Sequence, residues 1–281
     1  MRPIRQNQSD PEFESLFNDL MTEVFGFSFA PWHRLGLWGP GYECRGLIED
    51  GRLMANVSIS KMDLLVGGRP FRVHQFGAVA VRESCRGRGL AARLINEALA
   101  DYPGVPAFLF ANEEVLDFYP RFGFQRIYEH RPVLETVIDN DIPARPAAVG
   151  DPELAAALGR RARFSSVLDC VGSDSIRLFH LLLNYQDAAL TLPGGPLVTA
   201  VRLDRETLLL ADVAAPGPVS FADLKKVLPF SGIRRVEFGF CPDHLGLSPG
   251  WEKITDDQAP LFGRGDLVWP RVFRVPVLTV T

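Results

Sequence analysis

The sequence predicts an α/β (α+β) protein with a mixed central sheet flanked by helices, followed by a second, smaller α/β domain. Residues 73–111 read as strand, helix and strand, the pattern of a right-handed parallel crossover. Residues 139–152 are rich in proline, glycine and small residues, a composition that predicts a linker. Beyond the linker a similar order of helices and strands recurs. We therefore expect an internal duplication whose two copies have diverged in sequence.

The first predicted element is an amphipathic helix. Apolar residues recur at helical spacing between residues 13 and 24. Ser9 or Asp10 can cap this helix, and Ser9 with Glu12 fits a capping box. The stretch over residues 26–41 is rich in glycine and aromatic residues and has no clear period. We expect it to be either a packed surface loop or a lid over a pocket.

Three strands and a crossover are predicted next. Asp50-Gly51 is a strong two-residue hairpin signal between strands at residues 42–49 and 53–66, and Gly67-Gly68 turns the chain into residues 70–81. The later elements predicted for this half are a helix from Leu90 to the Pro103-Gly104 stop, an apolar strand at residues 107–111, a short helix at 113–119 and a strand at 125–130.

The second half repeats much of this order. We expect helices at residues 152–163, 175–185 and 221–228, and strands at residues 188–192, 197–203, 207–213 and 236–240. The predicted domains are therefore residues 1–138 and residues 151–281.

Composition excludes several classes of protein. The 281 residues carry 30 Lys and Arg against 34 Asp and Glu, and a net charge of −4 disfavours a nucleic-acid binder. No apolar run is long enough to span a bilayer, and the N-terminus lacks the apolar core of a secretory signal. We expect a cytoplasmic protein without a membrane or metal partner. The cysteines lie far apart and form no metal or redox pair: Cys44, Cys85, Cys170 and Cys241.

A glycine-rich turn between a strand and a helix carries the predicted chemistry. Gly87 and Gly89 let the backbone approach a ligand closely, and the first amides of the helix have no partner inside it. Such a helix start attracts phosphate. The alternative is a turn that needs glycine only for packing, with its arginines in solvent. Four arginines add positive charge to this region: Arg82, Arg86, Arg88 and Arg93.

The turn resembles the acyl-CoA signature of the GCN5-related N-acetyltransferase (GNAT) family, R/Q-x-x-G-x-G/A, which residues 86–91 satisfy in full. Residues 111–124 resemble the second signature of that family, a strand ending in Asn followed by Tyr and a Gly-Phe turn. The resemblance implies a GNAT fold over the first half and a degenerate GNAT-like second half. It also implies a set of acetyl-CoA-binding residues: Val79, Ala80, Val81, Arg86, Gly87, Arg88, Gly89, Leu90, Ala91 and Asn112.

The same resemblance implies roles in catalysis. An amine attacks the acyl thioester directly, a backbone amide near Val81 stabilises the oxyanion, and Tyr119 protonates the departing thiolate. Asn112 contacts the pantetheine arm or a water, caps the segment that follows it, or does both.

The general base is left open by the sequence. A carboxylate, a histidine or a water chain could take the proton of the attacking ammonium. Strand alternation cannot choose among the candidates, because a bulge near Gly77 would reverse the faces. The candidates, besides water, are His74, Glu43, Asp63 and His33.

The second half lacks a comparable phosphate site. The loop at residues 214–220 contains Pro216 and Pro218, which have no backbone N–H, and no arginine lies nearby. We expect this half to bind no acetyl-CoA, and instead to shape the acceptor pocket or to form a dimer contact.

The expected function is transfer of an acetyl group from acetyl-CoA to a primary amine of a small molecule. Two alternatives remain at this stage. The acceptor could be a protein or peptide amine, or the fold could bind acyl-CoA as a sensor without turnover. A homodimer is a possible assembly.

Overall fold

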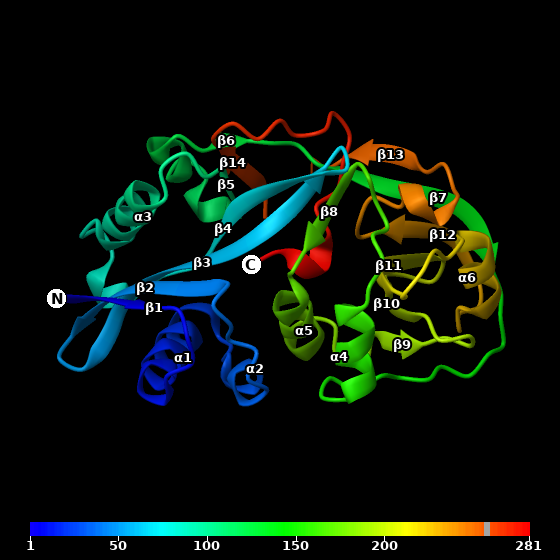
Figure 1. Ribbon diagram of the computed structural model, residues 1–281, viewed down its shortest axis with the longest axis horizontal. Coiled ribbons are helices and arrows are strands. Elements are labelled where there is room, and N and C mark those ends of the chain that lie inside the picture. Colours follow the sequence, from blue (N-terminus) through cyan, green and yellow to red (C-terminus); the bar gives the residue numbers. More distant parts are fainter. Residues whose placement is uncertain (256–258) are drawn as a thin grey trace.

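The structure, a computed structural model, describes residues 1–255 and 259–281. It confirms a mixed α/β fold in which two sheets lie side by side and helices flank both of them (Figure 1). The first sheet runs β1-β2-β3-β4-β5-β14-β6, and β8 pairs with β3. Its strands are β1 (Arg2–Gln6), β2 (Tyr42–Glu49), β3 (Arg52–Val66), β4 (Arg69–Val81), β5 (Ala107–Phe110), β6 (Gln125–Arg126), β8 (Leu168–Val171) and β14 (Leu261–Arg264).

The predicted meander and crossover of the first sheet are confirmed. Asp50 and Gly51 have φ values of 50° and 71°, the left-handed conformation that a tight hairpin between β2 and β3 needs. Helix α3 (Leu90–Asp101) then connects β4 to β5, which pair in parallel.

Helix α1 (Pro11–Phe25) covers one face of this sheet with an apolar side that includes Phe13 and Phe17. Asp10 is its cap, because the Asp10 carboxylate accepts a hydrogen bond of 2.9 Å from the amide of Phe13. The predicted Ser9–Glu12 capping box is wrong, since the Ser9 hydroxyl bonds the Glu14 carboxylate instead. The short helix α2 (Ala30–Arg34) lies in the segment predicted as loop or lid.

The helix predicted at residues 113–119 is wrong. Two 3₁₀ turns occupy this region, Glu113–Val115 and Tyr119–Phe122. The amides of Val115, Phe118 and Arg121 each bond the carbonyl three residues back, so the segment forms tight 3₁₀ turns in place of an α-helix. The strand predicted at residues 125–130 is reduced to the two residues of β6.

The second sheet runs β13-β7-β12-β11-β10-β9. Within it β11 and β12 pair in parallel through α6, which repeats the crossover of the first half. Its strands are β7 (His130–Ile138), β9 (Ala189–Thr191), β10 (Leu197–Arg202), β11 (Thr207–Ala214), β12 (Ile233–Phe238) and β13 (Gly250–Lys253). The helices of this half are α4 (Pro152–Gly159), α5 (Asp174–Leu183) and α6 (Phe221–Val227).

The two halves exchange strands, which the sequence did not predict. β7 precedes the linker but lies in the second sheet, whereas β8 and β14 follow the linker and lie in the first. β8 pairs with the far end of β3, at Asp63 to Val66, beyond the reach of β2. The predicted boundary between residues 138 and 151 therefore does not separate the sheets.

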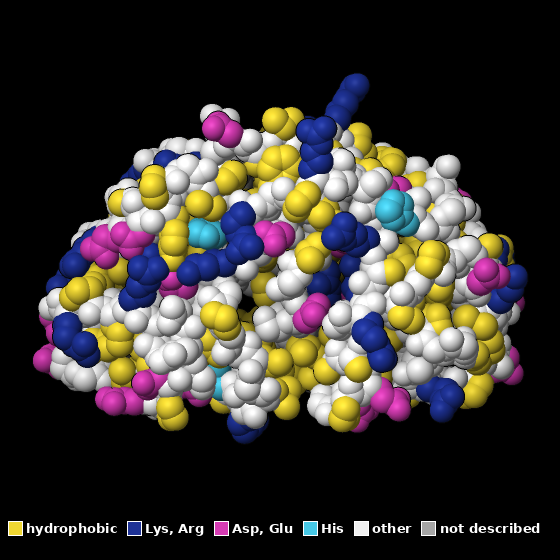
Figure 2. Space-filling model, in the orientation of Figure 1, with side chains coloured by type: hydrophobic (Ala, Val, Ile, Leu, Met, Phe, Trp, Pro, Cys, Tyr) yellow, Lys and Arg dark blue, Asp and Glu magenta, His cyan; other side chains and the backbone are white. Residues whose placement is uncertain are grey.

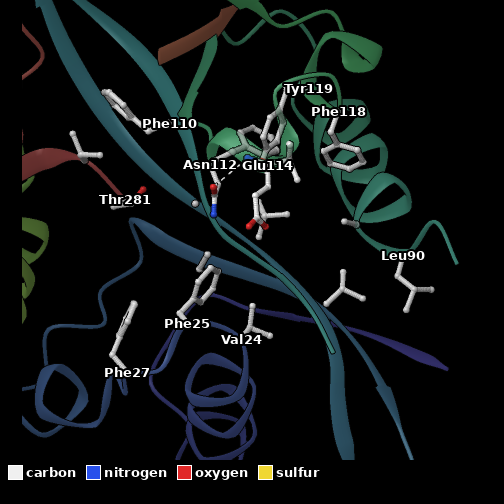
Figure 3. A pocket seen from close by; sticks show the side chains of 18 of the residues that line it. Val24, Phe25, Phe27, Leu90, Phe110, Asn112, Glu114, Phe118, Tyr119 and Thr281 are labelled. Atoms are coloured by element: carbon white, nitrogen blue, oxygen red, sulfur yellow. Dashed lines mark hydrogen bonds between the residues drawn. The ribbon is translucent and has the colours of Figure 1, made fainter. Parts of the chain in front are cut away.

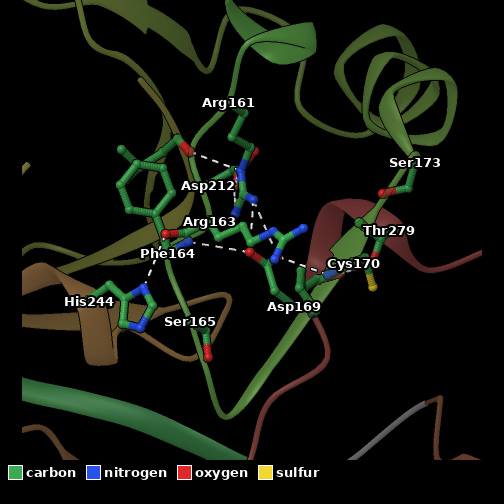
Figure 4. A network of polar contacts seen from close by, with 12 residues as sticks. Arg161, Arg163, Phe164, Ser165, Asp169, Cys170, Ser173, Asp212, His244 and Thr279 are labelled. Atoms are coloured by element: carbon green, nitrogen blue, oxygen red, sulfur yellow. Dashed lines mark hydrogen bonds and ion pairs between the residues drawn. The ribbon is translucent and has the colours of Figure 1, made fainter. Parts of the chain in front are cut away.

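A buried ionic network joins the halves (Figure 4). The carboxylate of Asp169 in β8 forms an ion pair with the guanidinium of Arg161 at 3.1 Å. The carboxylate of Asp212 in β11 pairs with Arg161 at 3.2 Å and with Arg177 of α5 at 3.4 Å. These four side chains are only 2–6% exposed. Two positive and two negative charges thus balance where β8, β11 and α5 meet.

All four cysteines are buried free thiols, as expected for Cys241. Among residues 1–255 and 259–281 no helix is long and apolar enough to cross a membrane.

Candidate active site

The site begins where β4 and β5 part. These strands pair only from His74 to Phe76 on β4, and past Phe76 they diverge. The next residues of β4 form a bulge: Gly77 pairs with Ser58 and Ala80 with Asn56, and Ala78 has a φ of 44°. A bulge bends the strand and re-aims its side chains and amides. The parted strand ends therefore present unpaired backbone to a neighbouring cavity.

A cavity of about 920 Å³ adjoins this backbone and extends between the two halves of the chain. One end is lined by the tip of β4 and the start of α3. The other end is lined by the segment from α1 to α2, by α5 of the second half and by Val280 and Thr281. Tyr119 and Asn112 lie between these ends (Figure 3).

The glycine-rich turn has the geometry of an anion site. Gly87 and Gly89 adopt φ values of 75° and 73°, and a Cβ at either position would meet nothing within 4 Å. Glycine is therefore required by the backbone and leaves open space beside it. Gly89 caps α3 without a side-chain hydrogen bond, and the first helical bond runs from Arg93 N to Gly89 O. The amides at the first turn of α3 are thus available to a ligand.

The predicted concentration of four arginines is wrong for two of them. Arg82 is buried, donates to Leu53 O at 2.8 Å, and forms ion pairs with Asp19 and Glu23 of α1. Arg93 pairs with Glu97 at 2.8 Å.

Of the other two, Arg86 lines the cavity, and Arg88 is exposed with Nη1 3.5 Å from the Cys85 sulfur. Arg86 therefore supplies the positive side chain at this end of the cavity.

Tyr119 is 6% exposed and packs edge-on against Phe118 with ring centroids 5.2 Å apart. Burial raises the pKa of its phenol to about 12, so the hydroxyl remains protonated at neutral pH. Asn112 accepts a hydrogen bond of 3.3 Å from the amide of Glu114 and also lines the cavity. Both readings of Asn112, as a cap and as a cavity residue, are thus compatible.

Comparison with protein families identifies this half of the chain. Residues 6–127 match the family model described as "Acetyltransferase (GNAT) domain". The matched stretch contains the parted strands, the glycine-rich turn and Tyr119. This stretch is similar to GNAT domains. A search among curated proteins found no match to this sequence.

Solved structures share the fold of almost the whole chain. A probable N-acyltransferase from Enterococcus faecalis aligns with a TM-score of 0.59 and 14% identity, covering 94% of this chain and 73% of that one. Eis1 from Mycobacterium abscessus aligns with a TM-score of 0.55 and 17% identity, covering 92% and 73%. A GCN5-related N-acetyltransferase from Kribbella flavida aligns with a TM-score of 0.53 and 15% identity, covering 93% and 70%. The two-half architecture therefore recurs in other GNAT-fold chains.

Most residues predicted from the GNAT signatures line the cavity. Ala80 does not, because its methyl group is buried in the core beneath α1, and Arg88 does not either. Those that line it are Val79, Val81, Arg86, Gly87, Gly89, Leu90, Ala91, Asn112 and Tyr119.

None of the four side chains predicted as candidate bases lines this cavity. Glu43 and His74 belong to a charged cluster over β2–β4, where Lys and Arg side chains gather beside a histidine (Figure 2). Burial alone would raise the pKa of Glu43, but its hydrogen-bonded neighbours lower it to about 2. Burial lowers the pKa of His74 to about 4, and its ring lies 4.5 Å from that of Tyr102. The neighbours that bond Glu43 are Tyr102, Lys61, Arg5 and Arg45.

The other two candidate bases, Asp63 and His33, also form their contacts outside the cavity. Asp63 pairs with Arg72 at 2.6 Å on the outer part of the sheet. His33 is buried in the aromatic core under α1, where its Nδ1 lies 3.1 Å from the Asn18 amide nitrogen. The bulge at Ala78 breaks the alternation along β4, so the sequence could not relate the face of His74 to that of Val79 and Val81.

Sequence reasoning also missed several residues that do line the cavity. Glu114 lies two residues after Asn112, inside the second signature. This position was the one local signal that it lines the cavity. The contributions of α5 and the C-terminal segment had no local signal. Thr281 lies so close to β4 that a Cβ at Gly77 would come within 2.7 Å of it, so Gly77 is needed for this approach. From α5 and the C-terminal segment, the missed lining residues also include Ile176, Phe179, His180, Asn184 and Val280.

Proposed function

We propose that this protein is an N-acetyltransferase that moves an acetyl group from acetyl-CoA to the primary amine of a small molecule. The observation that carries this proposal is that one cavity contains both an anion site and a proton donor. The free amides at the start of α3 open into the same 920 Å³ space as Tyr119.

The residues at the α3 end fit acetyl-CoA. The amides of the glycine-rich turn and Arg86 would hold the diphosphate, as helix N-termini do in general. Val79 and Val81, at the end of β4, would lie along the pantetheine arm, with Asn112 opposite. Acetyl-CoA would supply an acetyl group activated as a thioester.

The catalytic groups are then those already in the cavity. A backbone amide near Val81, just past the bulge at Ala78, would stabilise the negative oxygen that develops during attack. Tyr119 would donate its proton to the thiolate that leaves. Among the described lining residues Glu114 is the one acidic side chain, and it would attract the ammonium and accept its proton directly or through water.

The enclosure of the acceptor end supports a small molecule over a protein chain. Trp32 of α2 donates from Nε1 to Ser175 O of the second half at 2.9 Å, which ties the two walls together. A protein or peptide acceptor would need this contact to open. The second half would thus shape the acceptor pocket.

The decisive experiment measures thiol release from acetyl-CoA across a panel of amines and peptides, in parallel with acetyl-CoA binding by calorimetry. Release that depends on a small amine supports the proposal. Binding without release on any acceptor would indicate a sensor, and release with peptides alone would indicate a protein acetyltransferase.

Replacing Tyr119 with Phe should lower kcat roughly 100-fold or more, because the thiolate loses its proton donor. The acetyl-CoA dissociation constant should change less than about threefold, since the aromatic packing is kept. Steady-state kinetics and calorimetry on the same preparation measure the two effects. With its pKa near 12, Tyr119 should add no fall in wild-type kcat below about pH 11. Full activity of the Phe variant across the pH range would remove the assigned role.

Acetyl-CoA should bind with a stoichiometry of one per chain. In the second half the turn between β11 and α6 contains two prolines, and Ser220 Oγ already accepts the amide of Asp223 at 3.1 Å. This helix start therefore has one of its first amides already bonded, and the loop before it has two positions with no N–H to offer a diphosphate. Calorimetric titration measures the stoichiometry, and a value of two would contradict the assignment.

A further inference from the structure

The acceptor end of the cavity has an aromatic wall built from both halves of the chain. Phe29 stacks on Phe179 of α5 with ring centroids 4.7 Å apart, and Phe27 meets Phe179 at 6.1 Å. Phe25 stacks on Phe27 at 6.0 Å, and these two side chains are 43% and 37% exposed. Large apolar side chains left open at a pocket mouth indicate an apolar ligand.

The polar groups on this wall form hydrogen bonds with one another. His180 Nε2 lies 2.5 Å from Val280 O, and its Nδ1 lies 2.9 Å from the Asn184 amide nitrogen. Both ring nitrogens of His180 are therefore engaged. The wall offers few polar atoms to a hydroxyl-rich ligand, and such a ligand would lose its hydration without replacement.

The charged side chains of the cavity favour a ligand with a single ammonium group. Among the described residues that line the cavity, the acidic side chain is Glu114 and the Arg side chains are Arg86 and Arg121. Figure 3 shows the Glu114 carboxylate between the side of the pocket that carries Tyr119 and the side that carries Phe25. One carboxylate can hold one ammonium group, whereas a polycation would need several and would meet two arginines.

We infer that the acceptor is a primary monoamine with an aromatic or similarly apolar body, of the arylalkylamine class. This inference rests on the proposed function. The ring would lie against Phe27 and Phe179, and the ammonium would pair with Glu114. In the reaction the amine nitrogen forms a bond to the acetyl carbon while the carbon–sulfur bond breaks. The ammonium first gives one proton to Glu114, directly or through water, and the nitrogen loses a second proton to water after the attack. The departing sulfur gains one proton from Tyr119, whose phenol is then reprotonated from water.

The first test compares acceptors at constant acetyl-CoA. We expect kcat/KM for 2-phenylethylamine and tryptamine to exceed that for ethanolamine at least about 10-fold, because burying an aromatic ring favours binding. Spermidine and kanamycin represent the polycationic alternative. Equal or higher kcat/KM for either of these, or no effect of the ring, overturns the inference.

The second test uses variants. Phe27→Ala and Phe179→Leu should each raise the KM for 2-phenylethylamine about fivefold or more and leave the KM for ethanolamine within about twofold. Tyr128 is 47% exposed and lies outside the cavity lining, so Tyr128→Ala serves as the matched control and should change neither. Thermal unfolding identifies a variant that is merely misfolded. Phe27 is more exposed than Phe179, so its replacement should disturb the fold less. Equal effects on both amines contradict the aromatic contact.

The third test separates this inference from the proposed function. Glu114→Gln should weaken equilibrium binding of 2-phenylethylamine about 10-fold and leave binding of the neutral 2-phenylethanol unchanged, as measured by calorimetry without acetyl-CoA. If 2-phenylethylamine binds in this way but is never acetylated, the proposed function fails and the ligand class stands. If polar amines are acetylated and 2-phenylethylamine does not bind, the ligand class fails and the proposed function stands.

Discussion

Replacing Asp212 with Asn should lower the free energy of unfolding by roughly 3–5 kcal/mol, because it leaves a buried positive charge without its partner. Asp212 is 4% exposed and receives Arg161 at 3.2 Å and Arg177 at 3.4 Å. In the variant the two buried guanidinium groups share the buried carboxylate of Asp169, and Arg177 keeps a second acidic partner in Asp174, which is 45% exposed and 3.6 Å away. Urea unfolding followed by tryptophan fluorescence and circular dichroism measures the loss.

A surface ion pair provides the matched control. Lys226 and Asp223 lie 2.9 Å apart but are 71% and 73% exposed, so Lys226→Ala should change stability by less than about 1 kcal/mol. Adding Arg177→Gln to Asp212→Asn should cost less than the sum of the two single changes, since it restores charge balance. A loss below about 1 kcal/mol for Asp212→Asn would show that the network contributes little to holding the halves together.

Replacing Gly89 with Glu should weaken acetyl-CoA binding more than about 100-fold, because the change places bulk and negative charge where the diphosphate would lie. It also forces a non-glycine residue into a φ of 73°, a strain worth roughly 1–2 kcal/mol. Gly89→Ala carries that strain without the charge and should weaken binding much less. Calorimetric titration with acetyl-CoA and with free CoA measures both variants.

Gly194 controls for the backbone strain. It has a φ of 88° with nothing within 4 Å, and it lies in the second sheet between β9 and β10. Gly194→Glu should leave the acetyl-CoA dissociation constant within about twofold of wild type. Unchanged binding in Gly89→Glu, or equal losses in the two Glu variants, would place the diphosphate elsewhere.

Local sequence signals were sufficient for the parts of this protein that depend on neighbouring residues. Asp50-Gly51 determined a hairpin because only a few residue types adopt its positive φ angles. The alternation of a strand, a glycine-rich turn and an amphipathic helix determined the parallel crossover and its free helix amides at Gly89. Tyr119 and Asn112 were found because their spacing in a known signature is itself local. The helix predicted beyond Asn112 is instead two 3₁₀ turns, whose apolar spacing resembles that of a short α-helix.

Only the tertiary structure decided which side chains share a cavity. Glu43 of β2 and His74 of β4, reasonable bases by residue type, lie in a cluster with Lys61 and Tyr102 outside the cavity. The exchange of β7, β8 and β14 between sheets brings α5 against the first half, and with it Phe179. Such contacts join residues more than a hundred positions apart, and their free energy comes from burial and charge balance, which no local pattern encodes. The sequence by itself determined the glycine-rich turn with its free helix amides and the position of Tyr119, and the packing of two interlocked halves decided the shape and the apolar character of the cavity between them.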